Sequence, residues 1–461
     1  RGLGDVYKRQ LINHPIILKI DEINSSSRSG SNYTATIFEK SKLYATEIGK
    51  SIVYFKSNRN PDVRVGDIII TNAHPEPIVK NHNPGEFDQY SFNRMKGIAY
   101  KTSIQPQEYF LLGNDRSMVE NILSRIRANI LTSIRKYITQ RDQLGIAEAM
   151  LIGYKADLSK SLNNTYSIAG VSHVIAISGM HLGLIYLIIH QIFASVFKKK
   201  QLHIVALFIT LPLLWMFAMI TGSSASVLRS VIMYSFIIIG NLLTKNSNSL
   251  NALLGAGFIM NVYNPDILND IGFQLSFSAV LGITLMYQPI KKSLYTKNNI
   301  LEWGWNLVAL SLAAQIITTP FLLYHFHQFS TYSILNNIFI VPLSSIVLIL
   351  EIILCLCPFP ILCLKAIAPF ISMILTWMND FTAAMNKVPH ALITVPMLKW
   401  YQVLLWTIFF IGIACFILKK EKYPFLMITL TAASLLLVAN TFVQHTIKTT
   451  QQIILLNLHS S

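Results

Sequence analysis

The chain has 461 residues, of which 52% are hydrophobic and 13% charged, and its mean hydropathy is +0.46. A soluble domain carries about 25% charged residues, so this composition excludes a purely soluble protein and predicts a polytopic membrane protein. The net charge of +16 would suit a polyanionic partner, but basic loops on one side of a membrane give the same excess. Charge alone therefore does not predict nucleic-acid binding.

Polarity divides the chain into five segments. Residues 1–10 are polar and are interpreted as a non-native or disordered leading segment. Residues 11–110 are mixed in polarity, and residues 111–170 form a linker. Residues 171–441 are a series of long apolar runs, and 442–461 read as the start of a truncated domain. We therefore expect a further domain downstream of residue 461. If the segment 11–110 faces outward, as the charge pattern described below indicates, its export also requires membrane spans upstream of residue 1.

The segment 11–110 is predicted to be a β module. Its β-rich runs, separated by turn signals, are residues 16–23, 33–39, 51–56, 67–72 and 97–104. Five such strands suit a small barrel, for example an OB-fold facing the outside of the cell.

OB-folds often bind single-stranded nucleic acid through aromatic platforms and basic grooves. The aromatic candidates in this module are Tyr33, Phe38, Tyr44, Tyr54 and Phe55. Its 12 Lys and Arg residues against 10 Asp and Glu residues do not indicate a basic groove. The alternative that these rings form the core stays open.

The linker 111–170 is predicted to contain an amphipathic helix at the membrane interface. Residues 119–138 carry an apolar stripe at helical spacing, and Arg125, Arg127, Arg135 and Lys136 fall outside it. A basic amphipathic helix beside a membrane domain typically lies on the bilayer surface. Contact with DNA phosphates is the alternative.

About ten membrane spans are predicted from the apolar runs. They are residues 171–197, 202–221, 224–243, 248–264, 271–289, 304–323, 331–354, 366–385, 399–418 and 423–441. The odd-numbered gaps between them are rich in Lys, whereas the even-numbered gaps carry only Lys387 and Lys399. The positive-inside rule then makes the Lys-rich side cytoplasmic and places the β module outside.

The first predicted span carries polar residues that need a reason in a bilayer. His173, Ser178 and His181 lie in it, together with the G-x-x-x-G step of Gly179 and Gly183. One interpretation is close helix packing at the two glycines, with the histidines as satisfied partners. The other is that this polar face lines a path for a hydrophilic substrate.

Other polar residues enter the later spans. Arg229 lies in the third span, where it either offsets the charge of a polyanion or pairs internally, for example with Glu351. The remaining pathway candidates are Asp270, Gln274, Ser276, Gln315 and His325. Asp266, beside Pro265, is interpreted as solvated or as a cap of the fifth span. We predict no metal and no cofactor, because His325 and His327 lack a third ligand and the four cysteines lack zinc-ligand spacing.

Several stretches together resemble the ComEC/Rec2 family of competence proteins. They occur in the family's order and are residues 83–88 (NPGEFD), 172–184 (SHVIAISGMHLGL), 221–229 (TGSSASVLR), 270–277 (DIGFQLSF) and 324–330 (YHFHQFS), followed by Val341-Pro342. The similarity runs from about residue 11 to 440. The chain departs from the family pattern at Ala225, where members often have Pro, and the β module lacks the cysteines that some members pair.

The resemblance implies a function as the bacterial inner-membrane channel for single-stranded transforming DNA. It also implies an outer DNA receptor and a cytoplasmic ATP-driven motor as partners, allows a homo-oligomer, and places a metallo-β-lactamase-like domain after residue 452. The chain itself is then a transport channel without a nuclease site. A permease for a small anionic solute, an intramembrane glycan ligase or polymerase, and a structural scaffold are the competing hypotheses.

Overall fold

The structure is a computed structural model. It describes residues 15–27, 30–40, 45–55, 63–80, 89–105, 107–197, 201, 204–243, 248–294, 297–356, 361–395, 398–418 and 423–449. The predicted lead 1–10, residues 450–461 of the predicted segment 442–461, and Tyr44 lie outside the described residues, whereas residues 442–449 are helical. The chain forms two compact units: a β unit of described residues up to 129 with 154–157, and a helical unit of 130–153 and the described residues from 158 onward.

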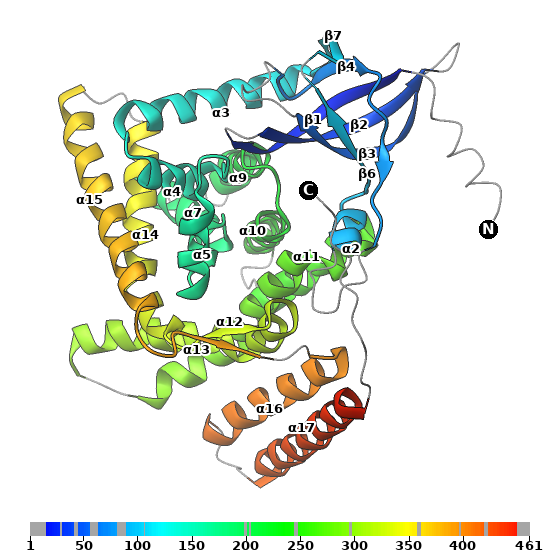
Figure 1. The fold of residues 1–461 in the computed structure, drawn as a ribbon. Coiled ribbons are helices and arrows are strands. Elements are labelled where there is room, and N and C mark those ends of the chain that lie inside the picture. The colour runs from blue at the N-terminus through cyan, green and yellow to red at the C-terminus, as the bar shows by residue number, and fades with distance from the viewer. Residues whose placement is uncertain are drawn as a thin grey trace. The chain divides into compact units, whose positions relative to one another are not determined.

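The β unit is built on one seven-stranded sheet (Figure 1). Its strands are β1 (Ile16–Ser27), β2 (Gly30–Lys40), β3 (Ala45–Phe55), β4 (Asp67–Thr71), β5 (Glu76–Pro77), β6 (Ile98–Ile104) and β7 (Tyr109–Asn114). They are ordered β5-β6-β3-β2-β1-β4-β7, and β3 and β6 are parallel while the other pairs are antiparallel. All five predicted runs are strands, and the sequence analysis missed β5 and β7.

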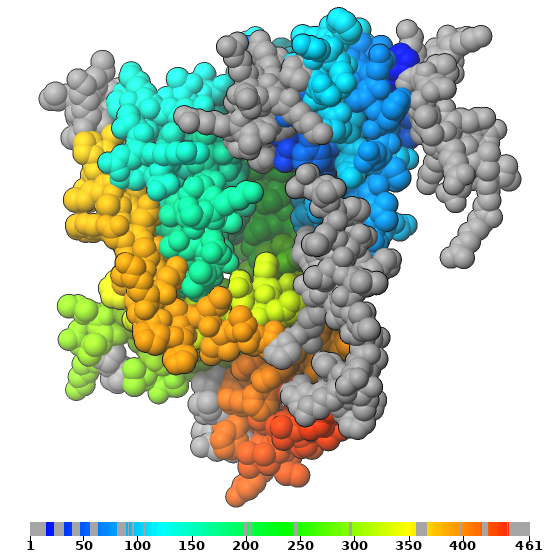
Figure 2. All heavy atoms as spheres, viewed as in Figure 1, coloured from blue at the N-terminus to red at the C-terminus, as the bar shows by residue number. Residues whose placement is uncertain are grey.

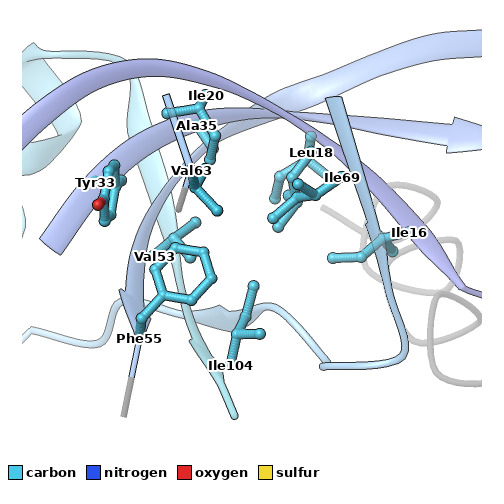
Figure 3. Close-up of a cluster of buried hydrophobic side chains, with 11 residues drawn as sticks. Ile16, Leu18, Ile20, Tyr33, Ala35, Val53, Phe55, Val63, Ile69 and Ile104 are labelled. Atoms are coloured by element: carbon cyan, nitrogen blue, oxygen red, sulfur yellow. The ribbon is translucent and has the colours of Figure 1, made fainter. Parts of the chain in front are cut away.

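The core of the β unit consists of alternating side chains from the sheet (Figure 3). In β1, for example, Ile16, Leu18 and Ile20 are buried, as period-two alternation requires when one face of a strand packs inward. Tyr33 and Phe55 are 4% and 2% exposed, and their rings meet edge to face with centroids 5.2 Å apart. These two aromatic residues therefore belong to the core and are not available as stacking platforms.

Helices make up the rest of the described chain. In the β unit, α2 (Gln89–Met95) precedes β6, and α3 (Met118–Tyr137) runs from the β unit into the helical unit. The helical unit continues with α4 (Arg141–Ile152), α5 (Lys160–Ile168), α6 (Ser172–Ile175), α7 (Gly179–Ala194), the π-helix η2 (Ala206–Thr210), α9 (Leu211–Ile220), α10 (Ala225–Leu243), α11 (Ser249–Tyr263) and the 3-10 helix η3 (Pro265–Asn269). It ends with α12 (Ile271–Ser293), α13 (Asn299–Phe326), β8 (Gln328–Ser330), α14 (Ser333–Leu356), α15 (Ile361–Asn386), β9 (Leu392–Thr394), α16 (Trp400–Leu418) and α17 (Tyr423–Thr449). Strands β8 and β9 pair antiparallel and join the ends of α13 and α15.

Four helices of the described residues are long and apolar enough to cross a membrane: α10, α12, α13 and α14. Each of the ten predicted spans contains helix, and several of these helices are shorter than a full span. The helical unit is thus a membrane-type bundle, while the count of ten crossings is not established by helix length.

One prediction for the start of the helical unit is wrong. The predicted single span 171–197 is broken at residues 176–178, between α6 and α7. The predicted amphipathic helix at residues 119–138 is observed as α3. Helix α4, which follows it in the predicted linker, has nine buried residues. It packs against α14 and α15, and Figure 2 shows atoms of α15 (yellow to orange) directly against those of α4 and α5 (cyan-green).

Candidate functional site

The break before α7 is held by a local hydrogen-bond pattern. Ser178 is the N-cap of α7, and its Oγ accepts from the backbone N–H of Met180 at 3.2 Å. The backbone N–H of Ser178 donates to Nδ1 of His181 at 2.9 Å, which places the ring proton of a neutral His181 on Nε2. The ring is 1% exposed, and Nε2 has no hydrogen-bond partner among the described residues.

The G-x-x-x-G step of α7 faces polar groups of α10. A Cβ atom on Gly179 would lie 2.6 Å from both Nη2 of Arg229 and Oγ of Ser230, and one on Gly183 would lie 2.7 Å from the hydroxyl of Tyr234. The glycines therefore let α7 approach α10 at the level of these polar side chains. The contact between α7 and α10, which we call the seam, therefore combines close helix packing with polar side chains.

Arg229 joins α10 to α12. It is 3% exposed, its Nη1 donates to the backbone carbonyl of Ser276, and its Nη2 donates to Ser230 Oγ at 3.0 Å. The guanidinium also lies 6.0 Å from the ring centroid of Phe277. Nε has no hydrogen-bond partner among the described residues, so its N–H group is left without an acceptor.

The ion pair with Glu351, given as an example of one of the two interpretations of Arg229, is not formed. The Arg229 donors go to α10 and α12, and both carboxylate oxygens of Glu351 in α14 are buried without a hydrogen-bond partner among the described residues. A guanidinium group can donate to backbone carbonyl oxygens and not only to carboxylates. The arginine is therefore accommodated without a counter-ion from α14.

A second polar contact joins α12 to α13. The Nε2 atom of His325 lies 2.6 Å from Oε1 of Gln274, and the amide of Gln274 donates to the carbonyl of Leu268 at 2.8 Å. An amide oxygen only accepts, so His325 donates from Nε2. Both side chains are partly exposed, unlike Arg229 and His181.

The side chains of the other predicted residues make separate contacts, although the backbone carbonyl of Ser276 accepts from Arg229. Asp270 is the N-cap of α12 and accepts from Phe273 N at 2.7 Å, whereas Asp266 is exposed in η3. Gln315 donates to Ser333 at 2.9 Å, Ser276 Oγ donates to the carbonyl of Phe273 at 3.2 Å, and His173 is exposed on α6. The described residues contain no group of three or more His, Cys, Asp or Glu residues arranged to hold a metal.

Sequence reasoning missed the polar contacts that attach α4 and α5 to the bundle. Gln143 donates to Thr376 at 2.7 Å, and the Tyr166 hydroxyl donates to Asn379 Oδ1 at 2.8 Å. Asn386 donates to the carbonyl of Thr165 at 2.9 Å. Amide side chains inside apolar runs were the available signal, because such groups need partners in a bilayer.

A membrane-type helical bundle, polar at the α7–α10–α12 seam and accompanied by a β unit, defines the class of protein. Within that class, a family described as "Competence protein" matches residues 150–421, more than half of the chain. The chain belongs to the ComEC/Rec2 family of competence proteins.

Two curated proteins are similar to this chain. ComE operon protein 3 of Bacillus subtilis (strain 168) is 29% identical over 262 residues, which cover 56% of this chain and 32% of that protein. Recombination protein 2 of Haemophilus influenzae (strain ATCC 51907 / DSM 11121 / KW20 / Rd) is 24% identical over 278 residues, which cover 58% of this chain and 34% of that protein. The matched regions thus span about a third of the length of these relatives. No solved structure matches the chain.

Proposed function

We propose that the helical unit forms the bacterial inner-membrane route by which single-stranded DNA enters the cell during natural competence. Membership of the competence family supports this role, and so does the presence of hydrogen-bonding side chains inside a membrane-type bundle. The proposed role is transport, with no chemical step. The proposed route runs along α7, α10 and α12, with about ten membrane crossings in all.

The observation that carries the proposal is the pair of buried, unpartnered nitrogen atoms, His181 Nε2 and Arg229 Nε. A buried donor left without an acceptor costs about 1–3 kcal/mol, and native proteins tolerate few such groups without a functional reason. Phosphate oxygens are strong acceptors for both groups. A passing nucleic-acid backbone could satisfy these donors in turn, and weak, multi-site contacts suit conduction.

The partly exposed residues of the site extend this proposed route. Gln274 and His325 present an amide and an imidazole beside the start of α12, and His173 is exposed on α6. Ser178, Ser276 and Gln315 would supply further hydrogen bonds, and neutral polar groups of this kind contact bases and sugars without holding the strand tightly. Asp270, the N-cap of α12, would lie at the mouth of the route, where its carboxylate accepts hydrogen bonds only.

The β unit is proposed to be an OB-like domain outside the cell that receives the strand. The one parallel pair, β3 with β6, in an otherwise antiparallel sheet of the described residues supports this assignment. Since Tyr33 and Phe55 are core residues, binding would depend on the half-buried Phe38 and Tyr54 or on backbone contacts. A gel-shift titration of the full protein with single-stranded DNA at several salt concentrations measures the phosphate contribution, because affinity falls with salt as contacts release counterions.

Uptake by Arg229 variants in the full-length, membrane-inserted protein tests the route. Arg229→Ala is expected to lower uptake of labelled DNA about tenfold or more, since a lost charged hydrogen bond is worth roughly 1.5–3 kcal/mol. Uptake by Arg229→Lys should lie between that of the unchanged protein and that of Arg229→Ala, because lysine keeps the charge but lacks the planar guanidinium group.

Ser345→Ala is the matched control for these variants. The Ser345 hydroxyl lies in α14 and donates to Val341 O of its own helix at 2.9 Å. Unchanged uptake by a stably inserted Arg229→Ala protein would reject Arg229 as part of the route. Equal losses for Ser345→Ala would point to a general packing defect.

A further inference from the structure

An exposed apolar edge lies on the β unit where β7 ends and α3 begins. Only residues 115–117 separate these two elements. Six large apolar side chains on this β7–α3 edge are about half exposed or more: Phe110 (72%), Leu111 (56%), Leu112 (58%), Met118 (80%), Val119 (57%) and Ile122 (48%). So many exposed large apolar side chains within 13 residues of chain indicate an interaction site.

Strand β7 exposes apolar residues on both of its faces. It stands at the end of the sheet order, next to β4, and the register shift between Ile68 and Ile69 leaves Leu112 without a paired residue. Successive residues of a strand point to opposite faces, and a bulge turns a side chain further. A flat protein surface would cover one face of Phe110, Leu111 and Leu112, whereas lipid covers both.

The start of α3 is held in place rather than frayed. Ser117 N–H donates to Glu120 Oε2 at 2.9 Å and Glu120 N–H donates to Ser117 Oγ at 3.2 Å, which completes a capping box. Asp115 is fixed by Lys19 at 3.0 Å and by its backbone N–H to the carbonyl of Gly66 at 3.0 Å. The apolar side chains of the edge therefore project from a fixed junction.

Basic residues accompany the edge on the same helix. Arg125 is exposed one turn after Ile122, and Arg127 lies 5.9 Å from the ring of Tyr154. Apolar residues next to arginines on one helix suit the boundary between acyl chains and anionic headgroups.

We propose that the β7–α3 edge inserts into the interface of an anionic bilayer. Phe110, Leu111 and Leu112 would lie below the headgroups, and Arg125 would lie at the level of the phosphates. The bilayer is a partner of this chain already, since four of its helices are of membrane-crossing length. This inference does not depend on the molecule that the helical unit transports.

The depth of a spin label tests the insertion in the full chain. Leu111→Cys is labelled in a background in which the four native cysteines are serines, and the protein is reconstituted in vesicles of phosphatidylcholine and phosphatidylglycerol. The label is expected to collide with oxygen and to be shielded from a water-soluble nickel complex, at a depth of about 5–10 Å. Leu112→Cys serves as the second reporter if the first variant does not fold.

Val79→Cys is the matched control, because Val79 is 71% exposed but follows β5 at the opposite end of the sheet order. Its label should be open to the nickel complex. A label at residue 111 that is equally open to nickel would overturn the proposal. A label shielded from both reagents would also overturn it, because protein would then cover the edge. Arg125→Gln should make insertion shallower in the mixed vesicles and leave it unchanged in phosphatidylcholine alone; an unchanged depth in both would overturn the role of Arg125.

Discussion

The β unit and the helical unit bury different kinds of side chains. In the β unit the core is apolar, and the buried polar groups are small and paired, as in the contact of 2.8 Å between the hydroxyls of Ser51 and Thr102. In the helical unit Arg229 and Glu351 are buried among apolar helices. A mid-membrane arginine costs roughly 2.5–3.5 kcal/mol on insertion scales, so these groups are not explained by stability alone.

The two units also reach close packing by different means. In the β unit, branched side chains on one face of the sheet fill the core. At the helix contacts, glycine residues, which have no side chain, let two helices approach closely. Gly179 and Gly183 bring α7 onto α10, and Gly282 brings α12 onto the backbone of Ala313 in α13. The β core should therefore be sensitive to lost volume, and the bundle to added volume.

Removing volume from the β core has the largest expected effect. Leu18→Ala is expected to lower the free energy of unfolding by about 2–5 kcal/mol, because Leu18 is fully buried and a cavity remains. Thermal and denaturant unfolding of the detergent-solubilised protein measures this change. Val79→Ala, at an exposed position, should leave the transition in place; a similar loss for both variants would contradict the assigned core.

Adding volume at the α12–α13 contact comes next. Gly282→Ala is expected to destabilise by roughly 1–3 kcal/mol, because its Cβ would meet the carbonyl oxygen of Ala313, which is backbone and cannot rotate away. Gly304→Ala in α13 is the control, since no atom lies within 4 Å of its added Cβ. That variant should be neutral or slightly stabilising, because Ala favours helix. A destabilised Gly304→Ala variant together with an unaffected Gly282→Ala variant would contradict the close α12–α13 contact at Gly282.

The polar attachment of α5 to α15 should contribute less. Tyr166→Phe removes the hydroxyl that donates to Asn379 and is expected to cost about 1.5 kcal/mol. In a double-mutant cycle, the variant with both Tyr166→Phe and Asn379→Leu should lose less stability than the two single variants lose together, because the two residues share one hydrogen bond. Strict additivity in the thermal unfolding of the four proteins would show that this hydrogen bond contributes nothing.

The smallest effect is expected at a helix end. Asp270→Ala removes the N-cap of α12 and should cost about 1 kcal/mol, seen as a small decrease in Tm. Asp266→Ala in the exposed 3-10 helix η3 should change Tm little, because its side chain is exposed and does not cap α12. Equal decreases for both variants would indicate a shared electrostatic effect in place of a cap.

Sequence periodicity predicted the elements better than their interruptions. Alternating apolar residues found five strands, and β5 and β7 were missed because one has two residues and the other exposes apolar residues along its length. The break at residues 176–178 was missed because hydropathy reports only how apolar a segment is. The break depends on hydrogen bonds from backbone N–H groups to the side chains of Ser178 and His181, which hydropathy does not detect.

The candidate site was only partly predictable for a related reason. Arg229, Ser276 and Gly179 could each be singled out by residue type, but the acceptor for Arg229 is a backbone carbonyl, which any residue could supply. The Glu351 pairing was inferred from opposite charge alone, and the fold brings other groups to Arg229. Burial of Tyr33 and Phe55 likewise depends on which face of the sheet packs inward.

The early end of α6 has an electrostatic consequence for the seam. Because α7 begins at Gly179, the aligned peptide dipoles of its 16 residues place a partial positive charge of about one half at that end. The guanidinium of Arg229 approaches the same residue, with Nη2 2.6 Å from where a Cβ of Gly179 would be. A helix uninterrupted from residue 172 would have its positive end about two turns away from Gly179. The break at residues 176–178 therefore brings the positive end of α7 and the guanidinium of Arg229 to the same point.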